Sequence, residues 1–337
     1  MRTQLKVSVI IPVYNMEKTL GLTIKSILKS NYKNIEIVIV DDCSDDDSVK
    51  IAKSFSCRVV QLKKRIGAGP ARNKGAEIAD GKILLFIDAD VFLLKNTIDE
   101  AIKSLTDHPE YSAVVGDYAE STVPKNFLSI YKNLFHNYYH QTSNKLTSTF
   151  FTACSAVRKD VFDKIGGFED RKGAKVEDIE LGYKMFKEKH LIFLNSNMQV
   201  VHCKKYTFLN LIKSDLFYRA IPWTKLICKS KMFNNDLNTR YESILSVILV
   251  YLLIFCLLFG VFLSWKSMAL LFCVLVFLSF FLININIFKF FLKRTDIIFS
   301  IRSFFMLMIY YFYCGIGFLI GTSSYLIDKL KIKSEYT

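Results

Sequence analysis

The sequence contains no Cys-x-x-Cys pair, although it has eight cysteines. Cysteine zinc sites are usually built from such closely spaced pairs, so we expect no site of this kind. The scattered cysteines also form no pattern typical of the disulfide framework of a small secreted protein. We therefore expect reduced, mostly buried thiols.

The longest apolar segments contain almost no charged residues. Hydrophobic residues make up 51% of the chain, and they are concentrated at about 243–263, 268–288 and 304–320. Segments of this length cross a hydrocarbon core of roughly 30 Å, and buried core helices rarely run so long without a polar face. The near absence of charge argues against a transporter, because transport pathways use ionisable groups. We predict about three membrane spans.

The first residues lack the features of a secretory signal peptide. Residues 1–6 are polar, and the apolar run Val7–Val13 is too short for a signal-peptide core with a cleavage site. We therefore expect a multi-pass protein of the plasma (inner) membrane whose first 240 residues are cytoplasmic. Three full crossings would place the basic tail 326–337 outside, against the positive-inside rule. Either the third segment is re-entrant or interfacial, or the short tail tolerates the mismatch.

Negative charge is also scarce: 31 acidic residues against 45 basic ones give a formal net charge of +14. The excess is dense between Val201 and Arg240, just before the first predicted span, where eight basic residues accompany two acidic ones. Anionic lipid head groups favour such a segment, so we expect a membrane partner and no nucleic acid. Within it, Phe208–Ile227 is amphipathic and kinked by Pro222, which predicts a helix in the bilayer interface.

The first half of the chain alternates strand and helix patterns. Apolar strands are predicted at Val7–Val13, Ile35–Val40, Arg58–Leu62 and Ile83–Ile87, and a helical pattern follows each of the first three. Such alternation predicts an α/β fold with a mainly parallel sheet. Ligands bind at the carboxyl ends of the strands in such sheets. Conspicuous polar residues occupy those ends: Tyr14, Asn15, Asp41, Asp42, Asp88 and Asp90.

Asp88 and Asp90 flank one small residue directly after an apolar strand. Mg²⁺ and Mn²⁺ take oxygen ligands, typically one or two carboxylates plus substrate phosphates. A cation held here would stabilise the charge on a departing nucleoside diphosphate. Asp41 and Asp42 follow another strand and could bond a base or ribose, whereas the acids after them suit a helix N-terminus.

Four motifs in order resemble the family 2 glycosyltransferases, which have a GT-A fold. They are Val7–Asn15 (VSVIIPVYN), Val40–Ser44 (VDDCS), Gly69–Asn73 (GPARN) and Asp88–Asp90 (DAD). The resemblance runs through essentially all of residues 7–205. It implies a catalytic domain at 1–205, followed by a juxtamembrane segment at 206–242, a transmembrane region at 243–325 and a polar tail at 326–337.

The resemblance also implies inverting transfer from a UDP- or GDP-sugar and assigns donor-side residues. Asp88 would contact the nucleotide-sugar, and Asp90 would hold Mn²⁺ or Mg²⁺. Asp41 or Asp42 would contact the nucleoside, with Arg72 nearby. The residues implied to line the nucleotide pocket are Pro12, Tyr14, Asn15 and Glu17.

On the acceptor side, Glu177 and Asp178 match an acidic pair of the family, after the glycine-containing loop Gly166–Gly173. Asp178 resembles the base that takes the acceptor proton, with Glu177 positioning the acceptor. His202 resembles a histidine that completes the metal shell in many GT-A enzymes. The segment Arg219–Trp223 lies where processive members carry Gln-x-x-Arg-Trp, and the resemblance implies that Arg219 contacts the diphosphate and Trp223 stacks on the acceptor. The missing glutamine argues against processive synthesis.

A base such as Asp178 favours a hydroxyl acceptor, because a phosphate oxygen is already ionised. We therefore expect sugar transfer to a membrane-associated, glycolipid-like acceptor. The alternatives are a polyprenyl-phosphate glycosyltransferase, a polysaccharide synthase and a catalytically inactive membrane scaffold. The intact Asp88, Asp90 and Asp178 argue against the scaffold. The aromatic stripe Phe127–Tyr139 is expected to be core packing rather than a ligand surface.

Overall fold

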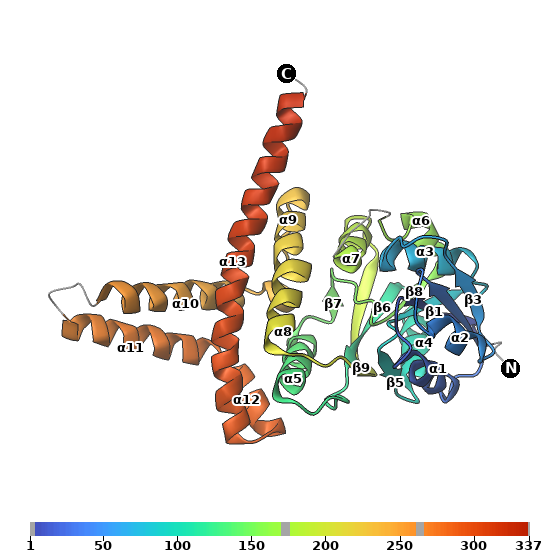
Figure 1. Ribbon diagram of the computed structural model, residues 1–337, viewed down its shortest axis with the longest axis horizontal. Coiled ribbons are helices and arrows are strands. Elements are labelled where there is room, and N and C mark those ends of the chain that lie inside the picture. Colours follow the sequence, from blue (N-terminus) through green and yellow to red (C-terminus); the bar gives the residue numbers. More distant parts are fainter. Residues whose placement is uncertain (1–3, 170–175, 261–265, 336–337) are drawn as a thin grey trace. The chain divides into compact units, whose positions relative to one another are not determined.

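The computed structural model describes residues 4–169, 176–260 and 266–335 (Figure 1). Residues 170–173 of the loop before Glu177, and residues 261–263 at the end of the first predicted span, lie outside this description. The chain divides into two compact units, Met1–Lys205 and Tyr206–Thr337. Each unit is described by itself.

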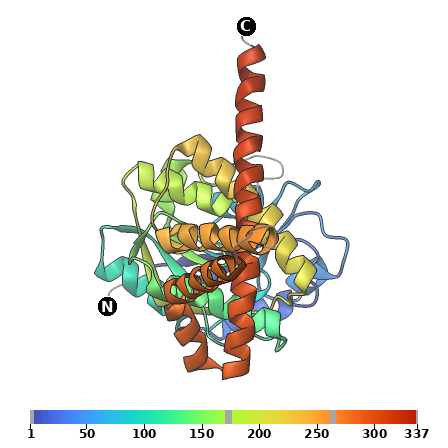
Figure 2. The ribbon, with the colours of Figure 1, turned by 90° about the vertical axis from the view of Figure 1, so that its left-hand side faces the viewer.

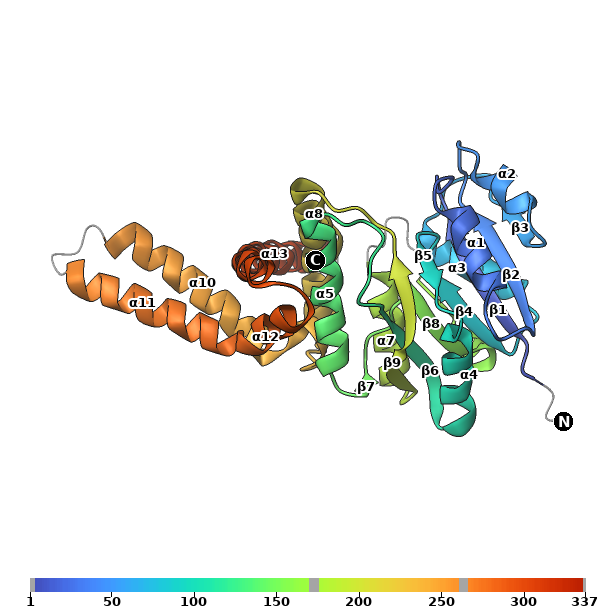
Figure 3. The same cartoon turned by 90° about the horizontal axis from the view of Figure 1, so that it is seen from below.

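The first unit is built on a mixed sheet with the strand order β3-β2-β1-β4-β8-β6-β9-β5, and β7 pairs with β9 (Figure 3). The strands are β1 (Val7–Val13), β2 (Ile35–Asp41), β3 (Arg58–Gln61), β4 (Ile83–Ile87), β5 (Val91–Leu93), β6 (Tyr111–Tyr118), β7 (Leu146–Thr147), β8 (Cys154–Arg158) and β9 (Leu191–His202). The helices are α1 (Leu20–Leu28), α2 (Ser48–Lys53), α3 (Ala68–Glu77), α4 (Thr97–Asp107), α5 (Phe127–Thr142), α6 (Lys159–Ile165) and α7 (Glu177–Lys187).

The four strands predicted from the alternating pattern form the parallel half of the sheet. β1 pairs in parallel with β2 and β4, and β2 pairs in parallel with β3. β1 is buried on both faces: Val9 and Ile11 join the core that includes Leu20 of α1, while Ile10 lies beneath Gly75 of α3. Burial on both faces explains why β1 is a continuous apolar run rather than an alternating one.

The other half of the sheet is not parallel throughout, because β8 runs antiparallel to both β4 and β6. The mainly parallel arrangement predicted from the sequence therefore holds for the first four strands, and the complete sheet is mixed. The aromatic stripe forms α5, in which Tyr131, Phe135 and Tyr139 are buried, as expected for core packing.

The second unit is helical and includes two helices long and apolar enough to cross a membrane, Tyr241–Phe259 and Ile297–Lys331. Its α-helices are α8 (Phe208–Asp215), α9 (Ile221–Ser230), α10 (Tyr241–Phe259), α11 (Lys266–Ile283), α12 (Ile285–Arg294) and α13 (Ile297–Glu335). A π-helical turn η1 (Leu216–Ala220) and a short 3-10 turn η2 (Leu237–Thr239) complete it. Figure 2 shows α13 as one continuous helix and α10 and α11 side by side.

Three sequence expectations change in this unit. The second predicted span breaks at Asn284, where α11 and α12 meet at a 60° bend, so it counts as a third span only if the bent pair crosses as one. The third predicted span is the middle of the much longer α13. The predicted kinked helix is instead α8, η1 and α9, with Pro222 in the first turn of α9, where a missing N–H is tolerated.

The cysteines are all free, as predicted, but most are not buried. Cys154 is buried and Cys43 is exposed, whereas the other six are partly exposed. Burial of a thiol depends on which face of a strand or helix carries it, and isolated cysteines give no periodic signal from which that face could be read.

Candidate functional site

The carboxyl ends of β1, β2 and β4 meet at one edge of the sheet. The β1–β4 ladder stops at the pair Ile10 and Phe86, two residues before Pro12, which has no N–H to continue it. The β1–β2 ladder continues to Val13 opposite Asp41, and the N–H of Asp42 donates to the carbonyl of Val13 at 2.7 Å. The strands β1 and β4 therefore separate where their polar residues begin.

Asn15 and Glu17 fasten the end of β1 to the loop after β2. Asn15 has a positive φ of 54°, its N–H donates to Ser44 Oγ at 3.0 Å and its side-chain oxygen accepts from the N–H of Asp45 at 3.0 Å. The N–H of Glu17 donates to Asp46 Oδ2 at 3.0 Å. Both were predicted to line a nucleotide pocket, and both have contacts that shape the loops of this edge.

Asp41 and Asp42 are both buried, but their carboxylates have different partners. Asp42 accepts from the N–H of Ile66 at 2.7 Å through one oxygen and from the N–H of Gly67 at 2.9 Å through the other. Asp41 accepts from the N–H of Ser44 at 3.3 Å through Oδ2, while its buried Oδ1 has no partner among the described residues. Asp42 thus holds the loop before α3, and Asp41 has an acceptor to offer.

Tyr14 is covered by a residue that the sequence analysis did not single out. The guanidinium of Arg65 lies 3.7 Å from the centre of the Tyr14 ring, a distance typical of a cation–π contact. Arg65 belongs to the segment between β3 and α3, and nothing in its sequence context indicated a partner at the end of β1. It brings a positive charge to this edge of the sheet.

Arg72 connects the carboxylate after β4 with the first residue of α7. Its side chain is 4% exposed, and it donates to Asp88 Oδ1 at 2.7 Å and to Glu177 Oε1 at 3.5 Å. Gly69 permits this approach, because a Cβ there would lie 3.1 Å from Cγ of Glu177. Asp88, predicted to contact the donor, and Glu177, predicted to position the acceptor, are therefore both bonded to the buried guanidinium of Arg72.

Asp90 and His202 are brought together by the pairing of β5 with β9. Val91, the residue after Asp90, lies opposite His202 in this pair of strands. The His202 Nε2 atom is 3.8 Å from Asp90 Oδ2. Burial, with the nearby charge of Asp88, raises the pKa of Asp90 to about 6. A divalent cation favours the ionised form of such a carboxylate, and the oxygen and nitrogen donors at this spacing suit Mn²⁺ or Mg²⁺. The residues present therefore fit a cation site.

Four predicted residues remain to be placed: Pro12, Asp178, Arg219 and Trp223. Pro12 is within β1, partly exposed, and Asp178 is in the first turn of α7, where its carboxylate accepts from the N–H of Ile179 at 2.9 Å. Arg219 and Trp223 belong to the second unit, in η1 and α9. Their proposed contacts with the donor and the acceptor stay predictions.

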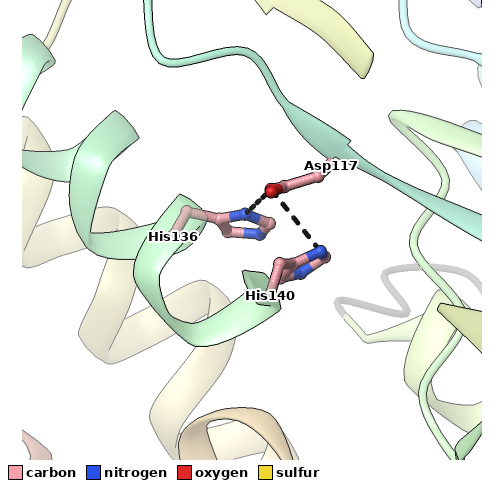
Figure 4. A group of neighbouring side chains, drawn as sticks. All are labelled: Asp117, His136 and His140. Carbon is pink, nitrogen blue, oxygen red and sulfur yellow. Dashed lines mark ion pairs between the residues drawn. The ribbon is translucent and has the colours of Figure 1, made fainter. Parts of the chain in front are cut away.

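A second group of side chains lies on β6 and α5: Asp117, His136 and His140 (Figure 4). The sequence analysis passed over it. The i, i+4 spacing of the two histidines was a visible signal for one helix face, but nothing in the sequence paired them with an aspartate on a strand.

Residues 8–166 match the family described as Glycosyl transferase family 2. GlyG of Streptococcus pneumoniae, a glycosyltransferase, is 34% identical over 117 residues, which are 33% of this chain and 38% of GlyG. WfaP of Escherichia coli, a UDP-Glc:alpha-D-GlcNAc-diphosphoundecaprenol beta-1,3-glucosyltransferase, is 34% identical over 125 residues, or 36% of this chain and 48% of WfaP. The chain thus spans less than half the length of both relatives.

Solved structures share the fold at low sequence identity. The mannosyltransferase PcManGT from Pyrobaculum calidifontis, in complex with GDP-Man and Mn²⁺, has a TM-score of 0.58 at 15% identity, covering 94% of this chain and 88% of PcManGT. Residues 1–349 of Staphylococcus aureus TarS, in complex with UDP-GlcNAc, have a TM-score of 0.53 at 21% identity, covering 71% of this chain and 70% of that one. The first unit therefore has the GT-A fold.

Proposed function

Because residues 8–166 form a glycosyl transferase family 2 domain, we propose that this enzyme transfers one sugar, with inversion, from a UDP- or GDP-sugar to a hydroxyl group of a membrane-associated, glycolipid-like acceptor. The observation that carries the proposal is the pair Asp90 and His202 beside Asp88, at the carboxyl edge of the sheet. This is where nucleotides bind in open α/β sheets.

The donor is held by side chains that the fold has already placed. Asp41 Oδ1 accepts a hydrogen bond from the base or the ribose, which supplies the partner that this buried oxygen lacks in the part of the chain that the structure describes. Asp88, whose side chain is 35% exposed, reaches the sugar-diphosphate while Arg72 fixes its other side. Asp90 and His202, with Asp88, would hold Mn²⁺ or Mg²⁺. When bound, the cation supplies Lewis-acid stabilisation of the departing diphosphate.

The acceptor is activated at the start of α7. Asp178 takes the proton of the acceptor hydroxyl. The hydroxyl oxygen then bonds to the anomeric carbon while the bond from that carbon to the diphosphate breaks. Glu177 acts as a positioning residue, because its carboxylate is tied to Arg72. Direct displacement from the opposite side inverts the configuration at the anomeric carbon.

A lipid-linked acceptor suits the composition of the chain. The relative WfaP is named for an acceptor linked to diphosphoundecaprenol, and two or three apolar helices of this chain are long enough to cross a membrane. We place the enzyme in the plasma (inner) membrane with its catalytic unit in the cytoplasm, where the basic residues between 201 and 240 meet anionic lipids.

The test is a donor screen with detergent-purified protein, UDP- and GDP-sugars and either Mn²⁺ or Mg²⁺, with products analysed in membrane lipid extracts. Asp178→Asn should lower kcat by about 10²- to 10⁴-fold, the usual contribution of a general base. Glu180→Gln makes the same chemical change two residues along α7 and should leave kcat near the parental value.

Asp90→Asn should remove the dependence of the rate on the cation. Full turnover of the parent protein in the presence of a strong chelator would refute the metal-assisted mechanism. An Asp178→Asn protein that works at the parental rate would identify an acceptor that is already ionised, such as a polyprenyl phosphate.

A further inference from the structure

Asp117, His136 and His140 form a compact group on one side of the sheet (Figure 4). Asp117 comes from β6, and the two histidines lie one helical turn apart on α5. One potential ligand atom from each residue lies within 4.8 Å of the other two. The group is buried: the side chains of Asp117, His136 and His140 are 0%, 11% and 4% exposed.

We propose that Asp117, His136 and His140 bind a divalent cation of the zinc type, separate from the Mn²⁺ or Mg²⁺ site. Nδ1 of His136 is 3.8 Å and Nδ1 of His140 is 3.7 Å from Asp117 Oδ1. Metal–ligand bonds of about 2.0–2.2 Å in a tetrahedron separate the ligand atoms by about 3.3–3.6 Å. A small inward movement of the side chains therefore brings them to the metal.

The ligand chemistry favours zinc over the cation used with nucleotides. Two imidazoles and one carboxylate suit zinc and its neighbours in the first transition series, whereas Mg²⁺ and Mn²⁺ prefer oxygen. Two histidines four residues apart on a helix present their rings on one face, as zinc-binding helices do. Deep burial keeps substrate away from the site, which indicates a structural role, and the three protein ligands leave the fourth tetrahedral position to a water molecule.

The surrounding bonds orient the ligands, as they do around established metal sites. Asn137 Nδ2 donates to Asp117 Oδ2 at 2.7 Å, and the N–H of Tyr118 donates to Asp117 Oδ1 at 2.7 Å. Nδ1 of His140 donates a hydrogen bond to the Gly116 carbonyl at 3.1 Å when no metal is bound, so this imidazole takes the other tautomer, with the proton on Nε2, when Nδ1 binds the metal. Each carboxylate oxygen of Asp117 thus has a hydrogen-bond donor that fixes its orientation.

The proposed site has a consequence for the catalytic edge through Tyr118. The ring of Tyr118 stacks on His202, with centroids 4.4 Å apart and planes at 9°. Its centroid is also 4.8 Å from that of His136. A cation that joins α5 to β6 would therefore stiffen the wall against which His202 is held.

The test uses full-length protein purified in detergent, stripped with a chelator and reloaded with Zn²⁺ or Co²⁺. We expect one tightly held Zn²⁺ per chain, and visible Co²⁺ absorption typical of tetrahedral nitrogen and oxygen ligation. The double variant His136→Gln, His140→Gln should weaken Zn²⁺ by about 100-fold or more, since loss of a mere outer partner costs 10- to 100-fold. His108→Gln, at an exposed histidine, is the matched control and should retain Zn²⁺.

Two further measurements keep the outcome decisive. X-ray absorption of the Zn²⁺-loaded parent protein should show two imidazoles and no sulfur, and this needs no variant to fold. Asp90→Asn should keep the Zn²⁺, so a failure of the nucleotide-site metal leaves this result intact. A parent protein that retains no Zn²⁺, sulfur ligation from the cysteines, or equal retention by the double variant would overturn the proposal.

Discussion

Asp41 and Asp42 are adjacent in the sequence, but replacing each carboxylate by an amide should have a different effect. Asp42→Asn should lower stability, whereas Asp41→Asn should weaken nucleotide binding. Both oxygens of Asp42 accept backbone N–H groups, from Ile66 and Gly67. An amide in Asp42→Asn turns one acceptor into a donor that faces an N–H. A buried mismatch of this kind costs about 1–3 kcal/mol. For a unit of this size, each kcal/mol lowers Tm by about 2–4 °C, so we expect a fall of about 2–12 °C.

Asp41→Asn should instead weaken nucleotide binding. Within the described part of the chain its Oδ1 has no partner, so the change removes a charged acceptor from the ligand and little from the protein. A hydrogen bond to a charged group contributes about 1.5–3 kcal/mol, which corresponds to a rise in Kd of about 10- to 150-fold.

Calorimetric titration with UDP and GDP, together with thermal unfolding, separates the two effects. The assignment would be refuted by an Asp41→Asn protein with unchanged Kd. It would equally be refuted by an Asp42→Asn protein that loses nucleotide binding at an unchanged Tm.

Two more predictions test the packing and the exposure of the first unit. Gly182→Ala drives a Cβ into the carbonyl oxygen of Ser148 and should lower stability by about 1–3 kcal/mol in thermal unfolding. Gly21→Ala in α1 should not, because its Cβ would lie at ordinary van der Waals distance from Ile51 and Phe55. Exposed Cys43, next to Asp42, should react with a maleimide more slowly when UDP or GDP is bound. Cys57 should react slowly at pH 8 with or without nucleotide, because burial raises its pKa to about 11 and leaves little thiolate. Equal Cys43 rates with and without the bound nucleotide would place the nucleotide elsewhere.

The parallel half of the sheet could be predicted because its strands are buried on both faces. That burial requires continuous apolar runs such as Val7–Val13, and a run followed by polar residues marks a strand end. β5, β6 and α4 were not predicted. β5 is only three residues long, Val91–Leu93, so it offers no periodicity to read. Its position depends on pairing with β9, more than 100 residues later in the sequence.

The candidate site shows the same limit at the level of single side chains. The sequence places four carboxylates at strand ends: Asp41, Asp42, Asp88 and Asp90. Which of them is free to contact a ligand depends on which backbone N–H groups from later in the chain bond to each carboxylate. Asp42 is occupied by the loop before α3 because that loop folds back across the end of β2. A contact between positions 42 and 66 leaves no trace in local composition, so the sequence alone could not separate Asp41 from Asp42.

Arg72 shows why the donor and acceptor carboxylates are best treated as one unit. Its guanidinium is buried and bonded to Asp88 and Glu177 at once, and its rigid planar fork of donors fixes both partners in one geometry, whereas a lysine ammonium is a point charge on a flexible stem. With the roles proposed above for these residues, a shift of Asp88 on donor binding would change the position of Glu177 at the start of α7, next to Asp178. Since removal of a buried ion-pair partner leaves an uncompensated charge, neither carboxylate can relax independently of the other. In the proposed mechanism, the geometry of the acceptor end would therefore depend on a correctly seated donor.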